Sequence, residues 1–255
     1  MMQLTNAVKQ ILIVNIILFV GAMLVPALNI YLPLYYFENP MFGWWQMVSH
    51  MFMHGGLMHI FFNMFALVSF GTVLEHFWGS KKFVLFYFLC GLGAATVNLA
   101  VNYFQFQGAY DYLINAGMTS NEVQTLLMEG TVNPQAVVQN TPQLQEAINQ
   151  ISSVFNTRMV GASGAIYGLL VAFAFMYPNA ELALMFIPVP IKAKYFVPAI
   201  LLLDLILGLN GGSFFGGSTG IAHFAHLGGA LVGFLLMWYW RKNQFNQNRW
   251  DRYGH

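Results

Sequence analysis

Residues 10–37 contain no charged side chain, and this long apolar stretch is the feature that most restricts how the chain can fold. Across the 255 residues, 58% are hydrophobic and only 7% are charged, whereas soluble domains carry roughly 25% charged residues. A water-soluble protein of this composition could not cover its surface with polar groups, so the lipid bilayer is expected to be its solvent. We therefore expect an all-α, polytopic membrane protein.

Apolar stretches of about 20 residues, the length that a membrane-spanning helix needs, recur along the chain and are separated by charges and polar turns. The expected spans are six in number and cover residues 10–30, 56–74, 83–102, 160–177, 194–209 and 221–240. The first stretch is longer than the apolar part of a signal peptide and lacks an obvious cleavage site. We interpret it as a retained first helix.

Basic residues determine the expected orientation, because Lys and Arg gather in cytoplasmic loops. With six spans, nine of the ten Lys and Arg residues fall on one side and Arg158 alone falls on the other. Both termini are then cytoplasmic, and the compact form without a targeting segment favours a bacterial inner membrane. A net charge of +1 and no basic run indicate no nucleic-acid partner. Cys90, the single cysteine, is expected to be a small buried core residue.

The domain organisation is expected to be simple, with residues 1–255 forming one membrane domain. A polar insertion at 103–158 interrupts it on the outer side, and helical spacing at 121–130 and 141–154 predicts a small pair of helices there. The outer loop 31–55 is too apolar to lie in water, so we expect it to lie partly in the membrane interface.

Polar residues inside membrane spans are energetically costly, so each one requires a physical reason. Helices that all run from outside to inside place His59, Asn63, Ser163 and His226 in the same outer third of the bilayer. Serine is a weak nucleophile unless a base lies within hydrogen-bonding reach. A neutral histidine such as His226 is the natural base, so the sequence predicts a Ser163–His226 pair.

Glycines show how these two residues could meet. Small residues at a four-residue spacing let helix backbones approach closely, and such faces occur on both helices that carry the pair. They consist of Gly161, Gly164 and Gly168 on one helix and of Gly229 and Gly233 on the other.

Acyl transfer also needs hydrogen-bond donors for the developing oxyanion. His59 and Asn63 lie four residues apart on one helix face, and with the backbone N–H of Ser163 they could supply these donors. Tyr167, four residues after Ser163, shares its face and could pack against the imidazole of His226.

Several of these polar residues could also serve only to hold the helices together. A glycine and serine motif is an ordinary packing device in membranes, and His54, His59 and Asn63 could simply form hydrogen bonds between helices. Asp204 has no partner motif and is expected near a span end or cavity where water solvates it. His223 could line the same cavity as His226. His50 and His76 lie near span ends, where an interfacial polar role is expected.

Two other classes of function fit less well. Histidines at 50, 54, 59, 223 and 226 could suggest metal or haem ligation, but no HExxH motif and no cysteine or carboxylate cluster completes a metal site. Transporters tend to show inverted repeats and broken helices at the midplane, and neither is evident. We therefore expect no metal and no cofactor.

Together these motifs resemble the rhomboid family of intramembrane serine proteases. The resemblance runs from about residue 43 to residue 240, and the order and spacing of its elements are specific. These elements are Trp45 in the first loop, His54-x4-His59-x3-Asn63, Glu75-x3-Gly79, Gly161-x-Ser163-Gly164-x2-Tyr167 and Ala225-His226-x2-Gly229-x3-Gly233.

The resemblance implies a rhomboid-like bundle of six helices that cleaves transmembrane segments of membrane-protein substrates. It implies Ser163 as nucleophile, His226 as general base with no third acidic member, and an oxyanion site of His59, Asn63 and the Ser163 backbone. Gly164 would allow close helix packing and Tyr167 would position His226. An inactive relative that binds membrane proteins without cutting them is the alternative.

Two features depart from the family pattern. Its first loop usually carries Trp-Arg, and this chain has Trp45-Gln46, so the arginine that anchors the loop is missing. The insertion is longer than the compact bacterial form needs.

The glycine-rich, uncharged loop 211–220 is expected to be a mobile cap past which the substrate enters.

Overall fold

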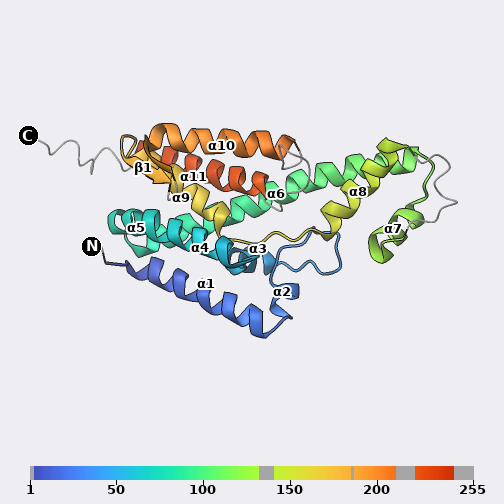
Figure 1. Ribbon diagram of the computed structural model, residues 1–255, viewed down its shortest axis with the longest axis horizontal. Helices are drawn as coiled ribbons and strands as arrows, with labels where there is room; N and C mark the ends of the chain where they lie inside the picture. Colours follow the sequence, from blue (N-terminus) through green and yellow to red (C-terminus); the bar gives the residue numbers. More distant parts are fainter. Residues whose placement is uncertain (1–2, 132–140, 185–186, 211–221, 244–255) are drawn as a thin grey trace, which may run out of the picture.

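The computed structural model describes residues 3–131, 141–184, 187–210 and 222–243, and it consists mainly of helices that lie side by side (Figure 1). The bundle contains α1 (Asn6–Leu24), α4 (Leu57–Ala66), η2 (Leu67–Gly71), α5 (Thr72–Trp78), α6 (Ser80–Asn115), α9 (Ser163–Met176), α10 (Ala193–Leu209) and α11 (His223–Asn243). The other helices are α2 (Leu28–Tyr31), α3 (Gln46–Ser49), η1 (His50–Phe52), α7 (Ser120–Glu129) and α8 (Pro142–Asn156). In Figure 1, α1 and α10 lie on opposite sides of the bundle.

Three helices in the described part of the chain are long and apolar enough to cross a membrane. They are α1, the continuous helix Leu57–Trp78 and α6. The second of these passes through a π-helical turn at η2, between α4 and α5. Many apolar side chains on the outer faces of the bundle are exposed, as expected of surfaces that contact lipid; examples are Ile17, Leu24, Phe65, Leu202 and Leu231.

The N-terminus of α1 is held by a buried carboxylate from α5. Glu75 accepts hydrogen bonds from the backbone N–H groups of Ala7 (2.8 Å) and Val8 (2.9 Å), which have no partner inside their own helix. It also accepts from the hydroxyls of Thr5 and Ser80, each at 2.5 Å. One side chain of α5 thereby holds the starts of α1 and α6.

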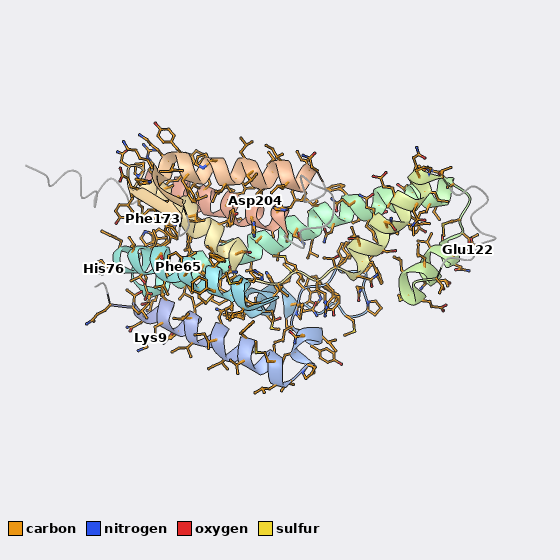
Figure 2. All side chains as sticks on the ribbon, viewed as in Figure 1. Lys9, Phe65, His76, Glu122, Phe173 and Asp204 are labelled. Carbon is orange, nitrogen blue, oxygen red and sulfur yellow. The ribbon has the colours of Figure 1, made fainter. Side chains whose placement is uncertain are left out.

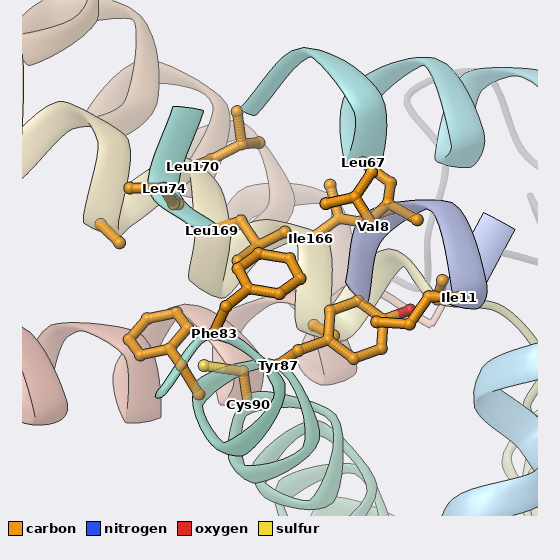
Figure 3. Close-up of a cluster of buried hydrophobic side chains, with 14 of the residues drawn as sticks. Val8, Ile11, Leu67, Leu74, Phe83, Tyr87, Cys90, Ile166, Leu169 and Leu170 are labelled. Atoms are coloured by element: carbon orange, nitrogen blue, oxygen red, sulfur yellow. The ribbon is translucent and has the colours of Figure 1, made fainter. Parts of the chain in front are cut away.

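Apolar side chains from α1, α5, α6 and α9 fill the centre of the bundle (Figure 3). Val8, Leu74, Phe83 and Leu169 are all fully buried there. Cys90 is also fully buried, which confirms its predicted place in the core.

The glycine faces bring α9 and α11 into backbone contact. A Cβ at Gly229 would overlap the backbone of Gly164, and one at Gly233 would lie 2.8 Å from the Cα of Gly168. These contacts confirm that the small residues on the two helices face each other.

The insertion is built on an unusually long helix. The helix predicted at residues 83–102 is longer than expected, because α6 continues to Asn115. Its 36 residues extend about 54 Å at 1.5 Å per residue, against about 30 Å for the hydrocarbon core. α7 and α8 confirm the predicted helix pair, and α8 folds back along α6 to form an arm that projects from the bundle (Figure 1).

The arm has its own apolar core, which explains how it folds outside the bundle. Phe106 and Leu113 of α6 pack with Val123 of α7 and with Leu144 and Ile151 of α8. Figure 2 shows Glu122 of α7 far from Asp204, which lies within the bundle.

The loop between α1 and α4 is anchored although the expected arginine is missing. Gln46 is completely buried, and its amide donates hydrogen bonds to the carbonyl oxygens of Met41 (2.8 Å) and Tyr31 (3.2 Å). Its side-chain oxygen accepts from the N–H of Tyr35 at 3.3 Å. Gln46 therefore supplies an anchor for this loop. Trp44 is 79% exposed, in line with an interfacial position.

His50, in the same loop, differs from the prediction of an interfacial role. It is 1% exposed, and its Nδ1 lies 2.7 Å from the carbonyl oxygen of Gln46. Burial lowers the pKa of His50 to about 4, so the ring is neutral and donates its Nδ1–H.

The sequence predicts an all-α fold, but the structure also contains two short strands. Between α9 and α10, β1 (Glu181–Leu184) and β2 (Ile187–Lys192) pair antiparallel, with Glu181 opposite Lys192 and Leu182 opposite Ile191. Pro188 and Pro190 explain the difference, because proline lacks the N–H that a helix interior requires.

Candidate active site

Ser163 is the first residue of α9, and the chain turns sharply just before it. Gly161 has φ +119, a conformation that side chains with a Cβ rarely adopt, and its N–H donates to the carbonyl oxygen of His50 at 2.9 Å. Because the first N–H groups of a helix lack intrahelical partners, the start of α9 presents backbone donors beside the serine hydroxyl.

His226 of α11 meets Ser163 directly. Its Nε2 lies 2.9 Å from the Ser163 Oγ, a hydrogen-bonding distance. The close approach of α9 and α11 at Gly164 and Gly229 makes this distance possible, since a side chain at Gly229 would force the helices apart. The structure thus brings together two residues that are 63 positions apart in the sequence.

Tyr167 fixes the plane of the imidazole. Its ring stacks on that of His226, with centroids 4.1 Å apart and an angle of 13° between the planes. The two rings come from adjacent helices, so the stack restricts rotation of His226 about its own side-chain bonds.

Asp204 of α10 lies behind the same imidazole and is the residue that the sequence reasoning missed. Each of its carboxylate oxygens is 3.3 Å from the His226 Nδ1, and one is 2.5 Å from the Nδ1 of His223. Asp204 is 5% exposed, so the prediction that water solvates it near a span end or a cavity is wrong. A carboxylate in an apolar helix was itself a signal, because such a group needs a partner in the membrane.

The Asp204 contacts also define the protonation of His226. A carboxylate accepts hydrogen bonds, so it favours the tautomer with the proton on Nδ1. The Nε2 then carries a lone pair and accepts from the Ser163 hydroxyl. Three side chains from α9, α10 and α11 form one chain of hydrogen bonds: Ser163, His226 and Asp204.

The same cluster also satisfies a minimal geometric condition for a metal site. One ligand atom from each of Asp204, His223 and His226 lies within 4.8 Å of the others. However, both histidines already contact the carboxylate through Nδ1, and an ion would have to replace these hydrogen bonds. The donor set therefore fits a hydrogen-bonded cluster better than a metal site.

His59 of α4 also lies close to Ser163. A Cβ at Gly161 would lie 2.8 Å from the His59 Nε2 and 3.6 Å from the Ser163 Oγ. The imidazole of His59 and the hydroxyl of Ser163 therefore both lie next to Gly161. The Nδ1 of His59 accepts a hydrogen bond from the N–H of Gly55 at 3.3 Å. This contact places the remaining ring proton on Nε2, which can then donate toward the site.

Asn63 and His54 are less directly engaged. The Asn63 amide donates to the carbonyl oxygen of His59 at 2.8 Å, so one of its two N–H bonds is used within its own helix. The His54 ring lies edge-on to that of His59, with centroids 5.1 Å apart. Neither ring nitrogen of His54 has a hydrogen-bond partner among the described residues, although both are buried.

A cavity of about 1010 Å³ opens onto this cluster, and Ser163, His59, His223 and His226 all line it. It provides space for water and for a substrate segment next to the serine. The expected cap at residues 211–220 lies outside the described residues.

The sequence profile of the Rhomboid domain matches residues 42–119 and 141–243 of this chain. The chain belongs to the rhomboid family. Residues 120–140, which include α7, lie between the two matched ranges, so this part of the arm is an addition to the family domain.

Named relatives support the assignment to the rhomboid family. An uncharacterized mitochondrial rhomboid protein of Schizosaccharomyces pombe is 26% identical over 212 residues, which cover 78% of this chain and 52% of that protein. The rhomboid protease AarA of Providencia stuartii is 25% identical over 206 residues, which cover 76% of this chain and 54% of AarA. The rhomboid protease GluP of Bacillus subtilis is 32% identical over 66 residues, which cover 26% of this chain and 13% of GluP.

The chain spans about half the length of the first two of these rhomboid relatives. Because the relatives come from mitochondria as well as from bacteria, membership of the family does not support the expected bacterial inner membrane. A membrane location itself follows from the family and from the apolar helices.

Proposed function

We propose that this rhomboid-family chain is an intramembrane serine protease that hydrolyses peptide bonds in or near transmembrane segments of membrane proteins. The observation that carries the proposal is the 2.9 Å contact between the Ser163 Oγ and the His226 Nε2. The names of the two bacterial relatives, both rhomboid proteases, support the same activity.

In the proposed reaction, the Ser163 Oγ attacks the carbonyl carbon of the scissile bond while its proton passes to the His226 Nε2. Asp204 holds the imidazole in the required tautomer and stabilises the imidazolium that forms. The imidazolium then protonates the leaving amine, the C–N bond breaks, and an acyl group remains on Ser163. A water molecule, deprotonated by His226, attacks the acyl carbon, and the ester is hydrolysed to the free acid and serine.

The oxyanion of each tetrahedral intermediate needs donors on the side of Ser163 opposite the base. We assign this role to the Nε2–H of His59 and the backbone N–H of Ser163, with Asn63 contributing the amide hydrogen that its helix does not use. The buried, unpartnered ring of His54 supports a hydrated site, because buried polar groups are usually satisfied by water or protein.

We further propose that α9, α10 and α11 complete six spans, with both termini in the cytoplasm and the arm on the outer side. Lys9 and His76 lie at the same end of the bundle, far from the arm (Figure 2), as this orientation requires. At 14 residues α9 extends only about 21 Å, which leaves Ser163 below the outer membrane surface.

The substrate's transmembrane segment would approach laterally beside α10. An apolar cavity of about 530 Å³ lies between α9, α10 and α11 and is lined by residues such as Val171, Val197, Leu201 and Phe234. Such a surface suits an apolar helix in lipid.

The proposal can be tested with a transmembrane substrate library in proteoliposomes, with cleavage products identified by mass spectrometry. The wild-type chain is expected to cut, and Ser163→Ala is expected to abolish cutting. Ser69→Ala, at a half-buried serine in another spanning helix, is the matched control. Equal cleavage by Ser163→Ala would contradict the proposal, whereas substrate binding without any cleavage by the wild type would favour the inactive, client-binding alternative.

A further inference from the structure

The cavity next to Ser163 does not end at the catalytic cluster. It continues out of the bundle between α6 and α8, so helices of the arm form part of its wall. We call this outer part the amide cleft, after the side chains that line it; these include Asn98, Asn102 and Gln105 of α6 and Gln150 of α8.

The amides of α6 form a regular row. Asn98, Asn102 and Gln105 occupy positions i, i+4 and i+7, which lie on one face of a helix. The first and last are about 10 Å apart along the axis, which matches roughly three residues of an extended peptide. Gln150 approaches the cleft from the facing helix.

These four amides have no side-chain hydrogen-bond partner within the part of the chain that the structure describes. Neighbouring polar groups behave differently: Arg158 donates to the carbonyl oxygen of Asn29 at 2.9 Å, and Gln145 donates to Asn149 at 3.1 Å. A carboxamide both donates and accepts, so a row of them complements the unpaired N–H and C=O groups of an extended backbone.

The charge of the cleft restricts its ligand further. No carboxylate lines it among the described residues, and Arg158 is one of the lining residues. A neutral or acidic peptide is therefore favoured over a basic one.

We propose that the amide cleft binds the extramembrane segment of the substrate that adjoins the scissile bond on the outer side, in extended conformation. This inference rests on the proposed protease function and assigns the arm a role in substrate recognition. Cleavage efficiency then depends on the polar, neutral or acidic flank as well as on the transmembrane segment.

The test compares two substrates with the same transmembrane segment, one with a polar ten-residue outer flank and one without it. In the full chain, Asn102→Leu with Gln105→Met removes two amides and keeps their size. The ratio of kcat/KM for the long substrate to that for the short one is expected to fall about tenfold, since each lost hydrogen bond is worth a few-fold in binding. Asn115→Leu with Gln107→Met, on the same helix but outside the cleft, is expected to preserve the ratio.

A second measurement separates this inference from the proposed function. A photoreactive residue at position 150 is expected to crosslink to the flank in a Ser163→Ala background, where no cleavage occurs. It is not expected to crosslink from position 145, which is exposed on a different face of the same helix and does not line the cleft. Cleavage with an unchanged ratio and no crosslink would overturn the amide cleft alone. Crosslinking without wild-type cleavage would leave the cleft standing and overturn the protease.

Discussion

Asp204→Asn is the substitution that most sharply tests how the three hydrogen-bonded side chains work. Asparagine has nearly the same shape as aspartate, so packing between α10 and α11 is retained while the negative charge is lost. Its amide can also turn an N–H toward His226, which favours the tautomer with the proton on Nε2. The Ser163 hydroxyl then loses its acceptor.

The expected size of the effect follows from the contacts. A hydrogen bond to a charged group contributes about 1.5–3 kcal/mol, which corresponds to about 10- to 150-fold in rate. The two oxygens of Asp204 are 3.3 Å from the His226 Nδ1, at the long end of a hydrogen bond. We therefore expect kcat to fall about 10- to 50-fold.

The assay is steady-state cleavage in proteoliposomes, with the melting temperature measured in parallel. KM is expected to stay within about twofold, because Asp204 does not touch the substrate. Asp204→Glu restores the charge and is expected to recover part of kcat. The reasoning is refuted if Asp204→Asn lowers the melting temperature and leaves kcat unchanged, since Asp204 would then be purely structural.

Three further predictions concern the oxyanion donors, the first loop and the helix contact. His59→Ala is expected to lower kcat about 10²- to 10³-fold. Asn63→Ala is expected to lower kcat less, because the Asn63 amide already donates a hydrogen bond within α4. A larger loss of kcat in Asn63→Ala than in His59→Ala would contradict the assignment of the oxyanion donors. His50 has a folded-state pKa of about 4 and an unfolded one of about 6.5, so only the unfolded state gains its proton between these values. The stability of the wild-type chain is therefore expected to fall by up to about 3 kcal/mol from pH 6.5 to 4. In thermal melts, His50→Asn is expected to weaken this pH dependence. The same pH dependence in His50→Asn and wild type would argue against a neutral buried ring. Gly229→Ala is expected to cost about 3 kcal/mol, whereas Gly108→Ala, where a Cβ meets open space, is expected to be neutral or stabilising; equal melting temperatures would contradict the backbone contact.

Much of the helical arrangement could be predicted from the sequence because its signals are local. Charged residues end apolar stretches, and Thr141-Pro142 marks the start of α8. The contact between Gly229 and Gly164 was also predictable, since two small-residue faces on apolar helices have a clear physical reason to meet. The roles assigned to Ser163 and His226 remain predictions, although the structure brings the two side chains together.

The remaining features depend on information that a local pattern does not contain. Which way α10 is rotated decides whether Asp204 faces lipid, water or His226, and an apolar helix with one polar residue does not specify that rotation. Similarly, the third helix was expected to end at residue 102, whereas α6 continues to Asn115 and packs against the helices of the arm. Gln46 anchors its loop through the carbonyl oxygens of Tyr31 and Met41 and the N–H of Tyr35. These three backbone groups come together only when the loop is folded.

The central claim is that Ser163 is a nucleophile activated by His226, and covalent labelling with a fluorophosphonate tests it without knowledge of the substrate. Mass spectrometry of the folded wild-type chain is expected to find the adduct on Ser163, and His226→Ala is expected to abolish labelling while the melting temperature is retained. Folded wild-type protein that acquires no adduct, or an adduct that persists in His226→Ala at the same rate, would contradict the account.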